Sequence, residues 1–389
     1  MLVAFLAAAV GASIQQQTLH TVNNFAIFRG AFYHLVAGRD LYASYPALYF
    51  DRFKYSPTFA FLIGPIAVLP MAVGLALWNL LNAGALWLML ARLFRPREAL
   101  IAMLLVWAEL LGSMQSAQSN ALVTALVVFA YLSLEAGDTG RGAVAIAIGA
   151  ATKIFPAAAV TLALLDPKRR RFAIAFALAL LVLAALPLTV TGPSTLAAQY
   201  RSWWAIEQLD ALAGTVPTDP HLLGGVMQQL RLWSPARWPN WPVQLAGTLV
   251  LILPLLLRPL HWSERSFRLR FLASLLIYMV IFNHQAESPT FVIAMTGIAT
   301  WYLAVPRGRA DTALLITALI FTSIATSDLT PHAIRNGIVR PYGVKAMPSI
   351  VIWLVLQAEL WGVRRPRPPD SDLAEVRALD PSKSPADRR

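Results

Sequence analysis

The chain of 389 residues contains no cysteine and few charged residues. Without cysteine it has no disulfide, no thiolate metal site and no cysteine nucleophile. Charged residues make up 13% of the chain, whereas soluble domains carry about 25%. Because 57% of the residues are hydrophobic, the few charges cannot cover a water-facing surface. Much of the exterior must therefore face lipid.

The sequence also lacks the short motifs of several common enzyme classes. It has no Walker loop, no GxGxxG and no GxSxG, and no histidine pair shows the spacing of zinc hydrolases. We therefore expect no metal site and no cofactor, although a divalent cation is left open. The energy for any reaction has to arrive with the substrate. No internal repeat is visible, which weighs against transporters built from duplicated halves.

The formal net charge is +12, and the basic residues occur in short runs between apolar segments. This distribution is the positive-inside pattern of cytoplasmic loops. We therefore expect membrane lipids and no nucleic acid among the partners. The runs include Arg92/Arg95/Arg97, Lys168 to Arg171, Arg265/Arg268/Arg270 and Arg364/Arg365/Arg367.

Apolar segments recur along the chain and predict an all-α, polytopic membrane helix bundle with about 11–13 membrane helices over 1–363. A tail over 364–389, rich in Pro, Asp, Ser and Arg, is expected to be disordered and cytoplasmic. Many segments are shorter than the roughly 20 residues of a perpendicular crossing, which is tolerated where backbone lines a wet cavity. The segments are 2–14, 57–94, 98–112, 121–135, 142–165, 172–190, 242–257, 271–282, 290–305, 311–325 and 347–362.

If the basic runs are cytoplasmic, polar loops collect on the opposite side. The segment 142–165 has basic flanks at both ends, so it should leave and return on the same side, with a break between Lys153 and Pro156. The segment 57–94 crosses once with a bend or twice. Apolar residues three or four apart in the first external loop predict an interfacial amphipathic helix; they are Phe25, Phe28, Phe32 and Leu35.

Lys153 stands alone in an apolar stretch, beside the expected helix break. An ionisable side chain at membrane depth is costly and is therefore a functional candidate. The alternative is that its ammonium reaches the headgroups along the aliphatic stem. Function is favoured because Pro156 opens the backbone at the same place.

Carboxylates and a histidine in the external loops are further candidates. His284 and Glu287 are three residues apart, so they could share a proton or orient a substrate hydroxyl; a hydrogen-bonded loop cap is the alternative. For Asp40 and Asp51 the alternative is ordinary turn capping.

Basic and amide side chains complete the set. Arg52 and Lys54 could grip a phosphate, because a guanidinium makes paired hydrogen bonds to phosphate oxygens, or they could bind lipid headgroups. Gln118 and Asn120 lie at the mouth of a short helix, where they could hydrogen-bond a ligand.

Several of these residues stand in motifs whose order along one multi-pass chain resembles glycosyltransferase family 87. The resemblance covers roughly residues 20–300. Its motifs are Asn24-Phe25, Gly38 to Tyr42, Lys54 to Ala60, Leu69-Pro70, Leu77 to Asn82, Gln118-Ser119-Asn120 and Ala151 to Pro156.

The resemblance implies the GT-C fold, similar to phosphatidylinositol-mannoside mannosyltransferases and membrane arabinofuranosyltransferases. Such a protein is a hexosyl- or pentosyltransferase of the bacterial cytoplasmic membrane, which takes sugar from a polyprenyl-phosphate donor on the extracytoplasmic face. It passes the sugar, with inversion, to a lipid or glycan acceptor. The donor- and acceptor-binding candidates are then Asn24, Arg52, Lys54, Gln118, Asn120, Lys153 and His284.

One position departs from the family pattern. An acidic residue early in the first external loop usually acts as the base, and here the matching positions are Asn23 and Asn24. A neutral amide cannot accept the acceptor proton. The catalytic candidates are therefore Asp40, Asp51 and Glu287, and position in the first loop favours the two aspartates.

Two other functions stay open at this point. A transporter or flippase of lipid-linked precursors would place polar groups near the membrane midplane from both halves of the chain, whereas here they gather on one side. A catalytically inactive paralogue that serves as a membrane scaffold would explain the missing carboxylate at Asn23 and Asn24.

Overall fold

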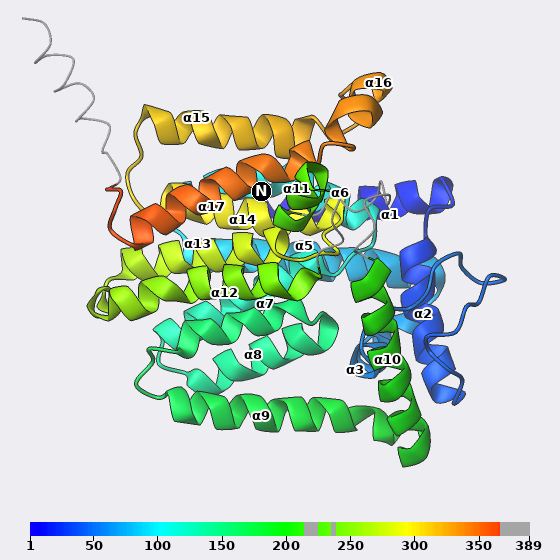
Figure 1. Cartoon of the computed structure of the whole chain (residues 1–389). Helices are drawn as coiled ribbons and strands as arrows, with labels where there is room; N and C mark the ends of the chain where they lie inside the picture. Colours follow the sequence, from blue (N-terminus) through cyan, green and yellow to red (C-terminus); the bar gives the residue numbers. More distant parts are fainter. Residues whose placement is uncertain (214–224, 235–238, 366–389) are drawn as a thin grey trace, which may run out of the picture.

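The computed structural model describes residues 1–213, 225–234 and 239–365, and these form an all-α bundle without a strand. Most of the longer helices run along a common direction (Figure 1). The expected all-α membrane bundle is confirmed. Of the expected tail over 364–389, Arg364 and Arg365 are described, and 366–389 lie outside the described residues.

The helices follow one another along the chain, most with short connections; a long described connection, 37–56, joins α2 to α3. Through the first half they are α1 (Leu2–Thr18), α2 (Asn23–Val36), α3 (Pro57–Leu62), α4 (Gly64–Ala67), α5 (Met71–Leu93), α6 (Pro96–Gln115), α7 (Asn120–Glu135), α8 (Thr139–Thr152), η1 (Phe155–Ala163), α9 (Arg169–Ala185), η2 (Leu186–Thr189) and α10 (Pro193–Ala213). The second half holds α11 (Val226–Trp233), α12 (Asn240–Leu257), η3 (Pro259–Ser263), α13 (Arg265–Ile281), η4 (Ser288–Thr290), α14 (Phe291–Leu303), α15 (Arg309–Ala318), η5 (Leu319–Ile324), α16 (His332–Ile334), η6 (Arg335–Val339), η7 (Val344–Ala346) and α17 (Met347–Leu360).

The centre of the bundle is α14, which is buried on every side from Phe291 to Trp301. It packs against α6, α7, α13 and α17. A helix that is apolar all round is stable only inside such a core or in lipid. Its approach to α13 is close at Gly297, where an added Cβ would lie 2.8 Å from the carbonyl oxygen of Ala273.

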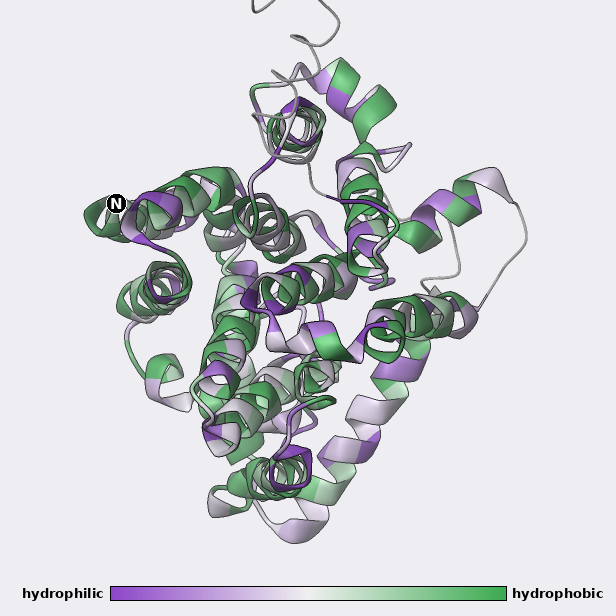
Figure 2. Cartoon of the chain, turned by 90° about the vertical axis from the view of Figure 1, so that its left-hand side faces the viewer, coloured by the Kyte–Doolittle hydropathy of each residue, from purple (hydrophilic) through white to green (hydrophobic). Residues whose placement is uncertain are grey.

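The outer helices instead expose apolar side chains. On α9 the side chains of Ile174, Leu178 and Leu181 are all more than half exposed, and hydrophobic residues cover the sides of the helices when the bundle is seen end on (Figure 2). Such large exposed apolar surfaces are unstable in water and are expected where lipid contacts the protein.

Four described helices are long and apolar enough to cross a membrane unaided, namely α5, α6, α9 with η2, and α12. Two bent pairs, α1 with α2 and α16–η6 with η7–α17, raise the number to six if each is one span. The other described helices are shorter or, like α10 with its 21 residues, not apolar enough, so the expected total of about 11–13 membrane helices stays a prediction.

The apolar stretch 57–94 divides into α3, α4 and the single long helix α5. Ser56 starts α3 by accepting a hydrogen bond from the Phe59 amide, with Pro57 at the first helical position. Pro70 then precedes α5. The stretch thus contains one spanning helix and not two.

The predicted helix that carries Phe25, Phe28, Phe32 and Leu35 is present as α2, which turns 87° away from α1. It buries Phe25, Phe28 and Leu35 against protein, on α3 and α4, and leaves Phe32 partly exposed; its position at a membrane interface stays a prediction. It also buries His34, whose ring stacks on Tyr45 with centroids 3.8 Å apart.

Replacement of Gly297 by alanine is expected to lower the stability of the bundle. The new Cβ would lie 2.8 Å from the carbonyl oxygen of Ala273, and overpacking of this kind costs roughly 1–3 kcal/mol. Gly84→Ala on α5 is the matched control, because nothing lies within 4 Å of its Cβ position and alanine is the better helix former. Thermal unfolding in detergent should show a loss for Gly297→Ala alone; equal midpoints would contradict the close packing.

Candidate functional site

The site is built around the break at the end of α8. Pro156 has no amide hydrogen, and its ring would clash with the carbonyl group four residues earlier, that of Thr152, so α8 ends at Thr152 and η1 begins at Phe155. Lys153 between them is extended, with φ −142° and ψ 143°. Since η1 packs back on α8, the predicted break and return of 142–165 are confirmed.

The Lys153 ammonium points at the connection between α6 and α7. Its Nζ donates to Asn120 Oδ1 at 2.7 Å and to Gln118 Oε1 at 3.2 Å. It also lies 5.5 Å from the ring centroid of Tyr55, whose hydroxyl donates to the same Gln118 oxygen at 3.0 Å. Two neutral amides and aromatic rings thus hold Lys153, and no described residue forms an ion pair with it.

A residue with a strained backbone conformation lies directly before Gln118 and orients the connection that carries the two amide side chains. Ala117, fully buried, has φ +48°, a left-handed conformation that is costly for a residue with a Cβ. Its carbonyl oxygen accepts a hydrogen bond from Trp78 Nε1 at 2.9 Å, which holds the turn in place. Backbone strain of this kind gathers at functional sites, where surrounding contacts maintain it.

Glu287 is the predicted carboxylate that the fold brings to this cluster. It lies in the connection between α13 and η4, where its Oε2 accepts from Gln118 Nε2 at 3.4 Å. The side chain is exposed, so a substrate can reach it. Gln118 therefore contacts both the cation and the carboxylate.

The two aspartates of the connection between α2 and α3 lie differently. Asp40 is exposed and accepts from the Tyr42 amide at 3.1 Å, and Asp51 accepts from the Arg52 amide at 2.7 Å. Both therefore cap their own turns. The Arg52 side chain is exposed. Asn24 lies nearer the cluster, since its Nδ2 donates to Ser116 O at 2.7 Å, two residues before Gln118.

Lys54 reaches toward α10, an element whose acidic residues the sequence reading passed over. Its Nζ lies 3.4 Å from Asp210 Oδ2. Burial lowers the pKa of Lys54, but Asp210 and Asp51 outweigh it and the pKa ends above its ordinary value. Glu207, one turn before Asp210, accepts from Trp203 Nε1 at 3.1 Å. The sequence did contain an indication of this site, because Glu207 and Asp210 are three residues apart and therefore lie on one face of a helix.

His284 is half-buried in the connection between α13 and η4, three residues before Glu287. Its Nδ1 lies 3.3 Å from Gln244 Nε2 on α12, while Nε2 is buried without a described hydrogen-bond partner. Burial lowers the pKa of His284, and the positive charge of Arg231 lowers it further. His284 is therefore neutral at pH 7 and can donate or accept a hydrogen bond.

A buried ion pair fixes the segment that carries Glu287. Lys345 Nζ lies 2.9 Å from Glu109 Oε2 and donates to Ser288 Oγ, also at 2.9 Å. Glu109 and Lys345 are 4% and 2% exposed. The sequence reading missed Glu109, although it is an ionisable residue inside an apolar segment, the same signal that marked Lys153.

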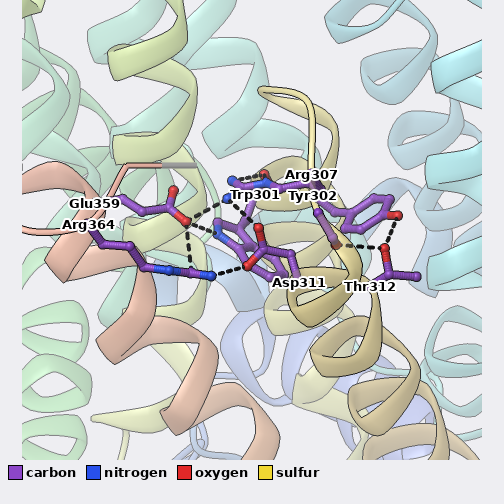
Figure 3. Close-up of polar contacts among 8 residues, drawn as sticks. Trp301, Tyr302, Arg307, Asp311, Thr312, Glu359 and Arg364 are labelled. Atoms are coloured by element: carbon purple, nitrogen blue, oxygen red, sulfur yellow. Dashed lines mark hydrogen bonds and ion pairs between the residues drawn. The ribbon is translucent and has the colours of Figure 1, made fainter. Parts of the chain in front are cut away.

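A second charged cluster lies at the opposite end of the bundle. Arg307 Nη1 is 2.5 Å from Glu359 Oε1 and 3.7 Å from Asp311 Oδ2, and Arg364 contacts both carboxylates (Figure 3). Arg307 also lies over the Trp301 ring, 4.4 Å from its centroid. Its charges are mutually compensated, so this cluster joins α14, α15 and α17.

No group of three or more His, Cys, Asp or Glu side chains in the described part of the chain could hold a metal ion. The end of the bundle that holds Lys153, called the polar end below, offers a cation held by amides, an accessible carboxylate and buried nitrogen atoms without a described hydrogen-bond partner. Besides His284 Nε2, Asn120 Nδ2 is buried without a described partner. Buried polar atoms of this kind call for a ligand or solvent partner.

A model of one protein family, described as Glycosyltransferase family 87, matches residues 53–283, which is more than half of the chain. The matched stretch includes Lys54, Gln118, Asn120 and Lys153, and it ends just before His284. A search of the curated proteins found no match.

The low pKa of His284 predicts a pH-dependent stability. In the unfolded chain a histidine binds a proton near pH 6.5, whereas the folded protein resists that proton. Stability is therefore full above about pH 6.5 and falls as the pH drops toward the folded-state pKa. The melting temperature in detergent should drop less between pH 7 and pH 5 for His284→Gln than for the wild type; parallel pH profiles would contradict this.

Removal of one partner of the Glu109–Lys345 pair should destabilise the protein strongly. Lys345→Met leaves a buried carboxylate without its cation, which costs roughly 3–5 kcal/mol. The double variant Glu109→Gln/Lys345→Met leaves no buried charge and should regain most of that loss. Thermal unfolding of both single variants and the double variant measures the coupling; additive effects would show that the pair does not interact.

Proposed function

Because the chain belongs to glycosyltransferase family 87, it is a membrane glycosyltransferase, and we propose that its donor is a polyprenyl-phosphate sugar. The acceptor is a lipid or glycan at the extracytoplasmic face of a bacterial cytoplasmic membrane. The observation that carries the proposal is the Lys153 ammonium, held by the amide oxygens of Gln118 and Asn120 without a described carboxylate in ion-pair contact.

A cation without a counter-ion is suited to an incoming phosphate. Two of the three ammonium hydrogens of Lys153 point at amide oxygens, and the third is left for a ligand oxygen. Away from bulk water its charge acts more strongly on the leaving phosphate than it would in solvent. Lys54 lies at the same end, but Asp210 compensates its charge; Gln118 and Asn120 offer hydrogen bonds to sugar hydroxyls.

Glu287 is the base in this proposal. It is reachable, and through Gln118 it is one side chain away from Lys153. Asp40 and Asp51 instead accept hydrogen bonds from neighbouring backbone amides, and neither has a described contact with Lys153, Gln118 or Asn120. Asn24, one of the two positions that match the usual family carboxylate, donates to Ser116 in the α6–α7 connection, and Glu287 contacts Gln118 in the same connection.

The proposed transfer is a single displacement. The acceptor oxygen attacks the anomeric carbon while Glu287 takes the hydroxyl proton. The bond from that carbon to the phosphate oxygen breaks, and the polyprenyl phosphate leaves with the electron pair beside Lys153. Attack opposite the leaving group inverts the anomeric centre. The reaction needs no cofactor, because the phosphate leaving group carries the activation.

Glu287→Gln is expected to reduce transfer by about 10²–10⁴-fold, the usual contribution of a general base, while donor binding is retained. Labelled polyprenyl-phosphate sugar, purified protein and a lipid extract as acceptor pool provide the assay. Asp40→Asn and Asp51→Asn are the matched controls and should keep most of the activity. If all three variants keep full function in cells, the protein acts as a scaffold.

Lys153→Met should abolish donor binding, because methionine keeps the stem volume and removes the charge. Lys168→Met, an exposed lysine at the opposite end of the bundle, is the control and should bind donor normally. Binding is measured with the labelled donor in detergent. Absence of binding to the wild type would refute the proposal, and movement of lipid-linked sugar across liposomes without a glycoside product would indicate a transporter.

A further inference from the structure

The end of the bundle opposite Lys153 contains a basic cavity that the proposed transfer does not use. It has a volume of about 850 Å³ and lies between the α5–α6 turn, the start of α13 and the α14–α15 connection. Four arginines line it, and Glu98 is its one acidic lining residue; the arginines are Arg92, Arg95, Arg265 and Arg307.

The four arginines are not equally available. Arg307 is compensated by Glu359 and Asp311 (Figure 3), and Arg265 donates to the Leu93 carbonyl oxygen at 3.0 Å. The exposed Arg92 and Arg95 form no ion pair with any residue in the described ranges. Because Arg265 keeps its charge and Glu98 supplies one negative charge, the cavity holds an excess of positive charge.

The rest of the lining is apolar. Leu93 and Phe94, both buried, line the cavity together with Leu303, Ala304 and Val305. A soluble anion gains nothing from such a wall. A phospholipid headgroup gains from both parts, because guanidinium groups pair with its phosphate oxygens and the wall covers its apolar glycerol and upper acyl carbons.

We propose that this cavity binds the phosphate of an anionic phospholipid headgroup from the leaflet at that end. Basic cavities between membrane helices are suited to such headgroups. The charge balance selects an anionic lipid, since a zwitterionic headgroup would bring its own cation next to Arg92 and Arg95. The bound lipid would join the α5–α6 turn to α13 and the α14–α15 connection.

Native mass spectrometry of the full-length protein, titrated with phosphatidylglycerol and with phosphatidylcholine of identical acyl chains, tests the proposal. Phosphatidylglycerol should bind more tightly. Arg92→Gln/Arg95→Gln should weaken that binding by about 25-fold, since each basic residue near an anionic headgroup contributes about fivefold. Both side chains are exposed, so the variant should keep the melting temperature of the lipid-free wild type.

Arg169→Gln/Arg170→Gln is the matched control, because it removes two exposed charges near the same end without touching the cavity. It should bind phosphatidylglycerol like the wild type. An equal loss in the control, or equal binding of the two lipids, would overturn the proposal. Inorganic phosphate forms the last arm: if it raises the melting temperature as much as phosphatidylglycerol does, the cavity takes a soluble anion and the lipid assignment is wrong.

Discussion

The structure depends on the cost of leaving a charge or a backbone polar group unsatisfied where water is scarce. Lys153 is placed at a point where Pro156 ends a helix, so an ammonium and open backbone occur together. The chain satisfies this cation with amide oxygens from the start of α7. Since neutral amides stabilise a cation without neutralising it, the positive charge stays available to an anionic ligand.

Several carboxylates of the described chain are already engaged in ion pairs or in capping turns, whereas Glu287 is not. Glu109, Glu359 and Asp311 neutralise buried cations, and Asp40 and Asp51 cap turns. Glu287 alone among the candidate bases meets the Lys153 cluster, through an amide donor at 3.4 Å. A single long hydrogen bond leaves its carboxylate accessible beside the Lys153 cluster, which places it better than the capped aspartates for the removal of an acceptor proton.

The two ends of the bundle are maintained by the last helices in different ways. At the polar end the Glu109–Lys345 pair and Ser288 hold the segment before α14, and thereby Glu287. At the other end Arg307, Glu359 and Arg364 tie α14 to α17. Buried pairs of this kind add little net stability but are costly to break, so they favour one arrangement of the helices over alternatives.

The sequence by itself determined the all-α class, the break between Lys153 and Pro156 and the amphipathic helix α2, because these follow from composition, proline chemistry and local periodicity. It also placed Lys153, Gln118 and Asn120 on one list of candidates. Only the tertiary structure decided that these three side chains meet, that Glu287 and not Asp40 or Asp51 joins them, and that Asp210 pairs with Lys54. Gln118 and Glu287 are 169 residues apart, and no local pattern encodes a contact that arises only when α7, α8 and α13 pack together.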